Sequence, residues 1–194
     1  MSWLGDDQYL PPIGVDWKPS RTVVSVLKLD GSKNKRAFFL ETVPASKALD
    51  ISPGKKIRIA DQNVVPGKPS LERYTIAGAK VFKERGAVLV LCRGRGTAIK
   101  RAKQIASTME KINENNELVK SVCKFLAVEH GPNTPLIDLL YSGVAYHHSG
   151  LSQEARLLIE GLIKKDLIKV VCGTTTLAQG VNFPISTVII ESLV

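Results

Sequence analysis

The chain has 194 residues, 44% of them hydrophobic, which is enough for one domain with a buried core or one domain with an appendage. Its net charge of +9 predicts an anionic partner, and the basic residues gather in three stretches, 55–58, 80–85 and 93–103. This pattern favours nucleic acid over a membrane, because it includes no long basic amphipathic stretch with aromatic anchors, and the longest apolar run, 87–92, is too short to span a bilayer.

The first part of the chain predicts an irregular lead-in and a β-hairpin. Residues 1–20 are rich in proline, glycine and aspartate, and two β-prone runs follow at 21–29 and 35–43, separated by a polar turn. Residues 44–69 contain four prolines and several lysines, so we expect a loop or linker there. We therefore treat 1–69 as one region of lead-in, hairpin and linker.

From Ser70 the pattern changes to alternating helices and strands, which predicts an α/β domain over 70–194. Short apolar runs indicate buried strands, and apolar residues at helical spacing indicate helices between them. Alternation of this kind implies a parallel sheet with right-handed crossovers, flanked by helices. The predicted strands are 87–92, 144–148, 168–172 and 187–191, and the predicted helices are 71–85, 97–109, 117–129, 135–141 and 152–165.

The three cysteines, Cys92, Cys123 and Cys172, lie far apart and form no CxxC pair. Two of them stand in apolar strand-like runs, where cysteine behaves as a small buried hydrophobic residue. We therefore expect reduced, structural thiols and a cytoplasmic protein.

Donor-rich sequences follow three of the predicted strands: RGRGT at 93–97, HHSG at 147–150 and GTTT at 173–176. In open α/β sheets ligands gather at the carboxyl ends of the strands, so these segments should line one edge. A strip of arginine, glycine, serine and threonine can bind a sugar-phosphate backbone without reading bases.

The segment from Thr174 to Pro184, TTTLAQGVNFP, is the most informative of the three. A strand, a glycine, hydroxyl groups and a short helix-capable stretch together present donors to a phosphate. The alternative is an ordinary helix cap, since serine and threonine begin helices for local reasons everywhere.

Two other patterns admit functional interpretations that the residues do not support. The RGRGT turn lacks the third glycine of a dinucleotide-binding loop, because Ile99 stands there. Two interpretations remain: a glycine turn with solvated arginines, or phosphate contact from Arg93 or a capping Thr97.

His147 and His148 are adjacent on a predicted strand and point to opposite faces, so we expect one to be packed, the other to face the site edge, and no metal site. The sequence also has no GxxxxGK[ST] loop and no DExx box.

Residues 143–193, GVAYHHSGLSQEARLLIEGLIKKDLIKVVCGTTTLAQGVNFPISTVIIESL, resemble the second RecA-like domain of superfamily-two DEAD/DEAH-type helicases, and the closest branch is the Ski-like group. VLVLCRGRGTAIKRA, at 88–102, is similar to motif IV of that family. The resemblance covers 70–194 well and 1–29 loosely. It implies a RecA-like (P-loop NTPase-type) sheet with the N-terminal hairpin as an extension.

The resemblance also implies roles for individual residues. The nucleic-acid backbone would be contacted by Arg93, Gly94, Thr97, His148, Ser149, Gly150, Thr174 and Thr176. Gly180 and Asn182 would face the nucleotide across the cleft to the first RecA-like domain, which would hold most of the ATP and Mg contacts. Motif VI would lie beyond Val194.

We therefore expect a motor-domain fragment of an ATP-dependent helicase that binds DNA or RNA and forms half of an interdomain ATP site. As part of the full-length protein it would be a nucleoside-triphosphate hydrolase, and on its own it would be inactive, with no catalytic residue in the fragment and no membrane partner. The alternative is a non-catalytic helicase-like module that binds nucleic acid or a protein partner.

Overall fold

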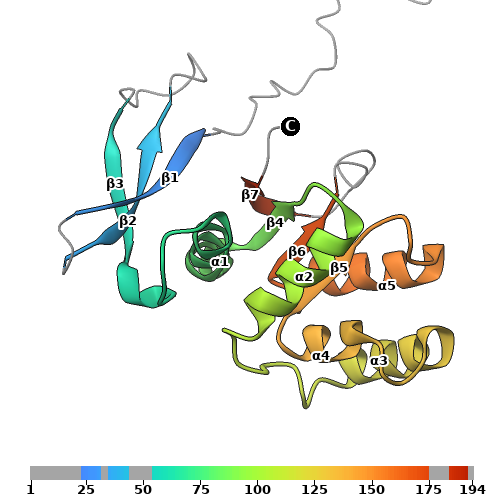
Figure 1. Cartoon of the computed structure of the whole chain (residues 1–194). Helices are drawn as coiled ribbons and strands as arrows, with labels where there is room; N and C mark the ends of the chain where they lie inside the picture. The colour runs from blue at the N-terminus through green and yellow to red at the C-terminus, as the bar shows by residue number, and fades with distance from the viewer. Residues whose placement is uncertain (1–22, 32–34, 44–53, 175–183, 192–194) are drawn as a thin grey trace, which may run out of the picture.

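The structure, a computed structural model, describes residues 23–31, 35–43, 54–174 and 184–191. It contains two sheets and five α-helices within these ranges (Figure 1). The strands are β1 Ser25–Asp30, β2 Ala37–Thr42, β3 Lys56–Asp61, β4 Ala87–Leu91, β5 Val144–His147, β6 Val170–Gly173 and β7 Ile185–Ile190. The helices are α1 Leu71–Phe82, α2 Arg95–Ala106, α3 Glu117–His130, α4 Pro135–Tyr141 and α5 Gln153–Lys164, with 3-10 turns η1 Gln62–Val64 and η2 Lys83–Arg85.

Strands β4 to β7 form a parallel sheet in the order β5-β6-β4-β7. The strands in the middle of the sheet are short apolar runs, and β5 and β6 are buried along their whole length, because helices cover both faces. The predicted α/β fold, a parallel sheet flanked by helices, is confirmed and is consistent with a RecA-like fold.

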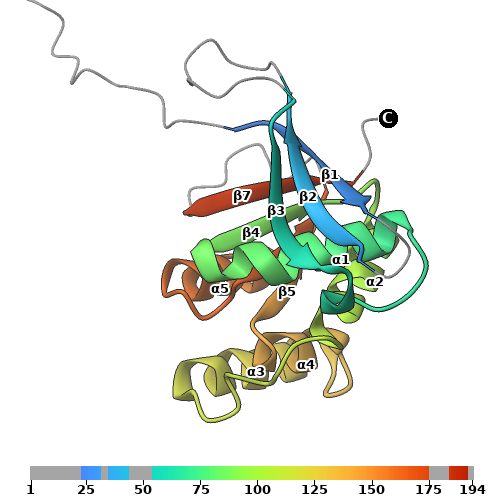
Figure 2. The same cartoon turned by 90° about the vertical axis from the view of Figure 1, so that its left-hand side faces the viewer.

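The helices divide between the two faces of this sheet. Helices α1 and α2 lie next to each other on one face, where α1 contacts β4 and β7 and α2 contacts β5 and β6. Helix α5 lies on the opposite face, as the two views at right angles show (Figures 1 and 2). Opposite faces follow from right-handed crossovers, because the chain crosses the sheet in one direction from β4 to β5 and returns from β5 to β6.

The N-terminal strands form a separate antiparallel sheet in the order β1-β2-β3. The predicted hairpin is confirmed as β1 and β2. The expectation of a loop or linker throughout 44–69 is wrong for Lys56–Asp61, which forms β3. The sequence KIRIAD alternates apolar and polar residues, and this strand signal was outweighed by the prolines at Pro53 and Pro66 on either side of it.

Helix α1 is packed between the two sheets (Figure 2). Its Gly78 allows this, since a Cβ built there would lie 2.9 Å from Ile189 of β7 and 3.4 Å from Leu27 of β1. Buried Arg73 of α1 donates to the backbone carbonyls of Gln62 and Val65 and lies over the Phe38 ring of β2. Hydrogen bonds from Arg73 therefore hold the turn after β3 against α1.

A buried polar network joins α1, α2 and the end of β7. Arg101 of α2 donates from Nε to Oε1 of Glu191 at 2.5 Å, and their side chains are 8% and 4% exposed. Thr75 of α1 donates to the same carboxylate at 3.1 Å, and Gln104 accepts from Arg101 and donates to Glu72. Because buried charges are tolerated only when paired and hydrogen-bonded, this network fixes the two helices against the sheet.

Two further observations concern the cysteines and the apolar character of the helices in the described part of the chain. The three cysteines are buried free thiols, and burial raises the pKa of the Cys172 thiol well above its ordinary value. Within the same ranges, none of the helices combines the length and apolar character that a membrane span requires.

The Arg101–Glu191 pair gives a test of how the fold is held. Glu191→Ala should lower the free energy of unfolding by about 3–5 kcal/mol, because it leaves Arg101 buried without its main counter-ion. The double variant Arg101→Met, Glu191→Leu should be clearly more stable than this single variant, since it removes both charges and keeps the volume. Urea denaturation of the three proteins measures the difference, and a double variant no more stable than Glu191→Ala would contradict it.

Candidate nucleic-acid interface

Three donor-rich segments begin at one edge of the parallel sheet. Leu91 of β4 and His147 of β5 are both in register with Gly173 of β6, so the three strands end in one row. We call this row and the residues that follow it the carboxyl edge. The expectation that the segments lie at the same edge is confirmed for the described residues, whereas their binding roles stay predictions.

The loop after β4 leads directly into helix α2. Arg93 is exposed, and Gly94 is the N-cap, with its carbonyl accepting from the Ala98 N–H at 2.9 Å and no side chain capping the helix. The expectation that Thr97 caps the helix is wrong, because the helix begins two residues earlier and Thr97 is its exposed third residue. The first N–H groups of α2 therefore face the carboxyl edge beside Arg93.

The start of α2 and the loop after β5 are joined by a side-chain hydrogen bond. Arg95 donates from Nη2 to the Ser149 hydroxyl at 2.7 Å, and both residues are exposed. Arg95 is a site residue that the sequence analysis did not predict. Its position as the second arginine of RGRGT could have indicated that it lies at this edge. The bond brings a guanidinium group and a hydroxyl together where a phosphate could meet both.

His148 is buried at this edge, with 7% of its surface exposed. Its ring stacks on Tyr146 at 5.3 Å between centroids, and Nδ1 accepts the Gly150 N–H at 3.1 Å. A Cβ at Gly150 would lie 3.0 Å from this ring, so glycine permits the close turn. Within the described ranges the buried Nε2 has no hydrogen-bond partner. Burial, and next the positive charge of Arg95, hold the pKa of His148 below its ordinary value.

The neighbouring histidine has a separate partner. His147 Nε2 lies 3.1 Å from Oε1 of Glu160 on α5, and burial lowers its pKa although Glu160 acts in the opposite direction. The expectation that one histidine is packed and the other faces the edge is therefore only half right, because both are buried. Among the residues that the structure describes, no three histidine, cysteine or acidic side chains form a group that could hold a metal ion.

The threonine-rich segment lies only partly within the described residues. Thr174 directly follows β6 and is half-buried at the carboxyl edge. Thr176, Gly180 and Asn182 lie outside the described residues. The predicted nucleotide contacts of Gly180 and Asn182 therefore stay predictions.

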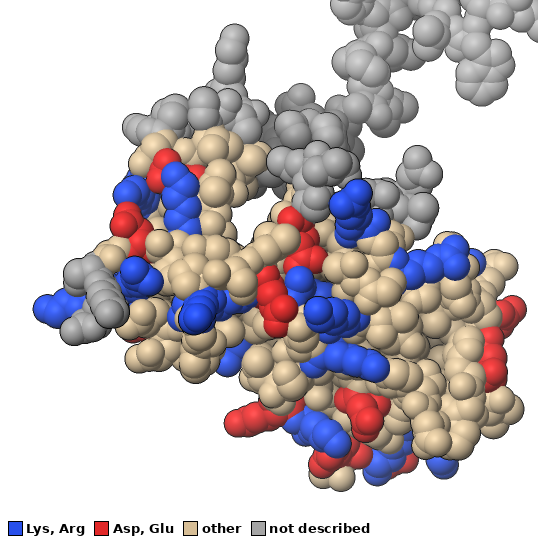
Figure 3. Space-filling view, in the orientation of Figure 1, with Lys and Arg blue, Asp and Glu red and all other residues tan. Residues whose placement is uncertain are grey.

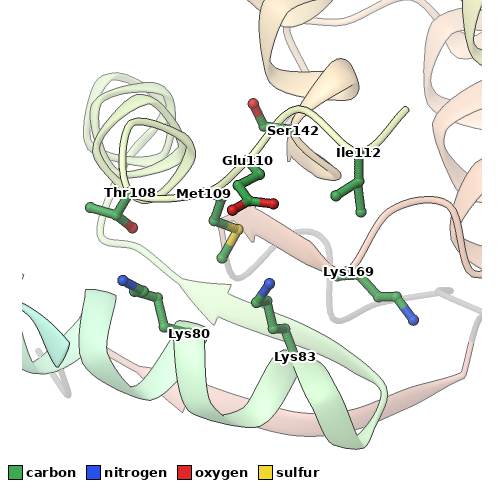
Figure 4. A pocket seen from close by; sticks show the side chains of 8 residues that line it. All are labelled: Lys80, Lys83, Thr108, Met109, Glu110, Ile112, Ser142 and Lys169. Atoms are coloured by element: carbon green, nitrogen blue, oxygen red, sulfur yellow. The ribbon is translucent and has the colours of Figure 1, made fainter. Parts of the chain in front are cut away.

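A second basic feature lies at the opposite edge of the sheet, where a pocket of about 310 Å³ opens between the ends of α1 and α2 (Figure 4). Its lysines already have partners: Lys80 donates to the Val64 carbonyl, Lys83 pairs with Glu84, and Lys169 pairs with Asp166. The carboxyl edge is the better candidate because Arg93 and Arg95 have no acidic partner within the described residues. The pocket is lined by Lys80, Lys83, Thr108, Met109, Glu110, Ile112, Ser142 and Lys169.

Comparison with known proteins finds relatives that match parts of this chain. The chain is 39% identical over 112 residues to the ATP-dependent DNA helicase Hel308 of Pyrococcus abyssi, across 57% of this chain and 16% of the relative. It is 32% identical over 126 residues to the ATP-dependent DNA helicase homolog MER3 of Arabidopsis thaliana, across 63% of this chain and 11% of the relative. It is 30% identical over 175 residues to DNA polymerase theta of Caenorhabditis elegans, across 84% of this chain and 11% of the relative. No family model matches the chain.

The chain is similar to part of several ATP-dependent DNA helicases. It spans only 11% to 16% of the length of these three relatives. The similarity therefore concerns one segment of each relative.

The two buried histidines predict that folding stability falls in mild acid. Both pKa values are lowered in the folded chain, so the unfolded chain takes up protons first as the pH falls below about 6.5. Stability is therefore fully present above that pH and is lost below it. In His148→Asn an amide oxygen can replace Nδ1 as acceptor without titrating, so the loss between pH 7.5 and 5.5 should be smaller than in the unaltered chain.

Urea midpoints at the two pH values measure this effect. His147 remains in the variant, so part of the loss should remain. An equal loss in the variant and the unaltered chain would contradict the role given to His148.

Proposed function

We propose that residues 70–194 are part of the second RecA-like domain of an ATP-dependent superfamily-two helicase of the Ski-like branch, and that the carboxyl edge binds the backbone of a DNA strand. The observation that carries this proposal is the row formed by Leu91, Gly173 and His147, from which three donor-rich segments begin. The similarity to Hel308 and to a MER3 homolog, both named as ATP-dependent DNA helicases, supports DNA as the ligand.

The chemistry of the edge suits phosphate groups. It offers the guanidinium groups of Arg93 and Arg95, the hydroxyl of Ser149 and the first backbone N–H groups of α2. These groups donate hydrogen bonds or carry positive charge, as a phosphodiester requires. Contacts of this kind position a strand without selecting its sequence. The expected activity is therefore sequence-independent binding.

In this proposal ATP is held between two domains. The first RecA-like domain would supply the Walker loop, the DExx box and most of the contacts to ATP and Mg, and neither motif occurs in this sequence. Gly180 and Asn182 would complete the nucleotide site from this side, while Thr174 and Thr176 contact the strand. The segment 174–184 would then couple the two ligands. The chain by itself should bind DNA without hydrolysing ATP.

Titration of a fluorescent single strand at several salt concentrations tests the proposal. Binding through phosphates should weaken as salt rises, and each phosphate contact should contribute a slope of about −0.7 in log K against log salt. Arg93→Gln should remove about one phosphate contact and so make the slope shallower by about 0.7. It should weaken binding to strands of different sequence equally.

Arg85→Gln is a matched control, because Arg85 is an exposed arginine in η2 at the opposite edge of the sheet. It should leave the slope unchanged. Binding that ignores salt, or equal effects of the two substitutions, would overturn the assignment of the carboxyl edge.

A further inference from the structure

We propose that the DNA strand does not end at the carboxyl edge but continues along the outer face of α2, where Lys100 and Lys103 contact further phosphates. This inference rests on the proposed function, since it extends the same binding surface. We call the exposed residues Thr97, Lys100 and Lys103 the outer face of α2.

The orientation of α2 separates its basic residues into two groups. Arg101, together with Ala98, Ala102 and Ile105, is buried toward the sheet, and Arg101 is neutralised by Glu191. Lys100 and Lys103 are exposed on the other side of the helix. These two lysines are therefore the charges that the middle of α2 offers to an external anion.

The outer face of α2 has no acidic residue of its own. From Arg93 to Met109 the sequence contains no aspartate or glutamate. Neither Lys100 nor Lys103 forms an ion pair within the described ranges, whereas Lys28, Lys56 and Lys120 each pair with a carboxylate. Like charges three residues apart on a helix repel each other, so this face carries a small energetic cost that a bound phosphate would relieve.

The charge of this face joins that of the carboxyl edge. Basic side chains gather over α2 on the side of the molecule that faces the viewer (Figure 3). Arg95, at the start of the same helix, is bonded to Ser149 across the edge. The positive surface therefore begins at the carboxyl edge and follows the helix away from it.

The length of this surface sets the size of strand that it can bind. Lys103 is eight residues after Arg95, which is about 12 Å along a helix at 1.5 Å per residue. That distance corresponds to on the order of two to four nucleotides of one strand. A strand just long enough to cover the carboxyl edge would not reach Lys103.

The test compares Lys100→Gln, Lys103→Gln with Lys164→Gln, Lys165→Gln, a pair of exposed lysines at the far end of α5. Both double variants lose two positive charges and keep residues that favour helices. Each is titrated with labelled single strands of about 4 and about 16 nucleotides. On the long strand, two lost phosphate contacts should weaken binding by on the order of 25-fold at 0.1 M salt and reduce the slope by about 1.4.

The outcomes distinguish the two proposals. The inference is supported if the α2 variant weakens binding of the long strand far more than the α5 variant and leaves the short strand almost unaffected. It is overturned if the two variants behave alike while Arg93→Gln still weakens binding, because the carboxyl edge then binds without α2. If the unaltered chain binds neither strand in a salt-dependent manner, the proposed function itself fails. Circular dichroism of both variants checks that the helices are retained.

Discussion

The buried ion pair between Arg101 and Glu191 is the contact on which the arrangement of the carboxyl edge depends. Glu191 directly follows β7, and its N–H donates to the Leu91 carbonyl at the end of β4. Arg101 lies in the middle of the helix that starts from this same edge. The pair therefore holds α2 to the strands, and the bond from Thr75 to Glu191 adds α1 to the same contact. Because a buried charge is tolerated only when it is paired and hydrogen-bonded, Arg101 requires α2 to stay within reach of Glu191.

This contact also determines which positive charges are available to a ligand. Arg101 is neutralised inside, so the free charges of α2 lie at its start and on its outer face. At the opposite edge the lysines of the pocket are engaged by carbonyls or carboxylates. The net charge of +9 includes Arg93, Arg95, Lys100 and Lys103 on the carboxyl edge and α2, and none of these four has an acidic partner within the described residues.

Much of the fold could be predicted from the sequence, because apolar periodicity is strong where an element is buried. Helix 135–141 and the strands around 87–91 and 144–147 follow from such patterns. Strand β3 was missed because it is mostly exposed and stands between prolines. The fold class predicts that β4, β5 and β6 end at the same edge. Their exact register, however, depends on pairing between distant segments, and no single segment of the sequence determines it.

The candidate site was predicted less completely, for a different reason. Arg93, Ser149 and Thr174 could be proposed from their place after strands. In the sequence, however, Arg101 is one of several basic residues between Arg93 and Lys103. Nothing in the local sequence shows that it is buried and paired with a glutamate 90 residues later. The cap at Gly94 was missed because threonine is the commoner cap, while a glycine in a loop can serve equally well. Partners distant in sequence decide these details.

Binding of a DNA strand by one continuous surface, the carboxyl edge with the outer face of α2, can be observed residue by residue. The ¹⁵N-labelled chain is titrated with a single strand, and the backbone amide chemical shifts are followed. We predict that the largest changes fall at residues 93–103, 148–150 and 174, and that residues 108–112 and 142 at the opposite pocket change little. Largest changes at that pocket or in the antiparallel sheet would contradict binding at this surface.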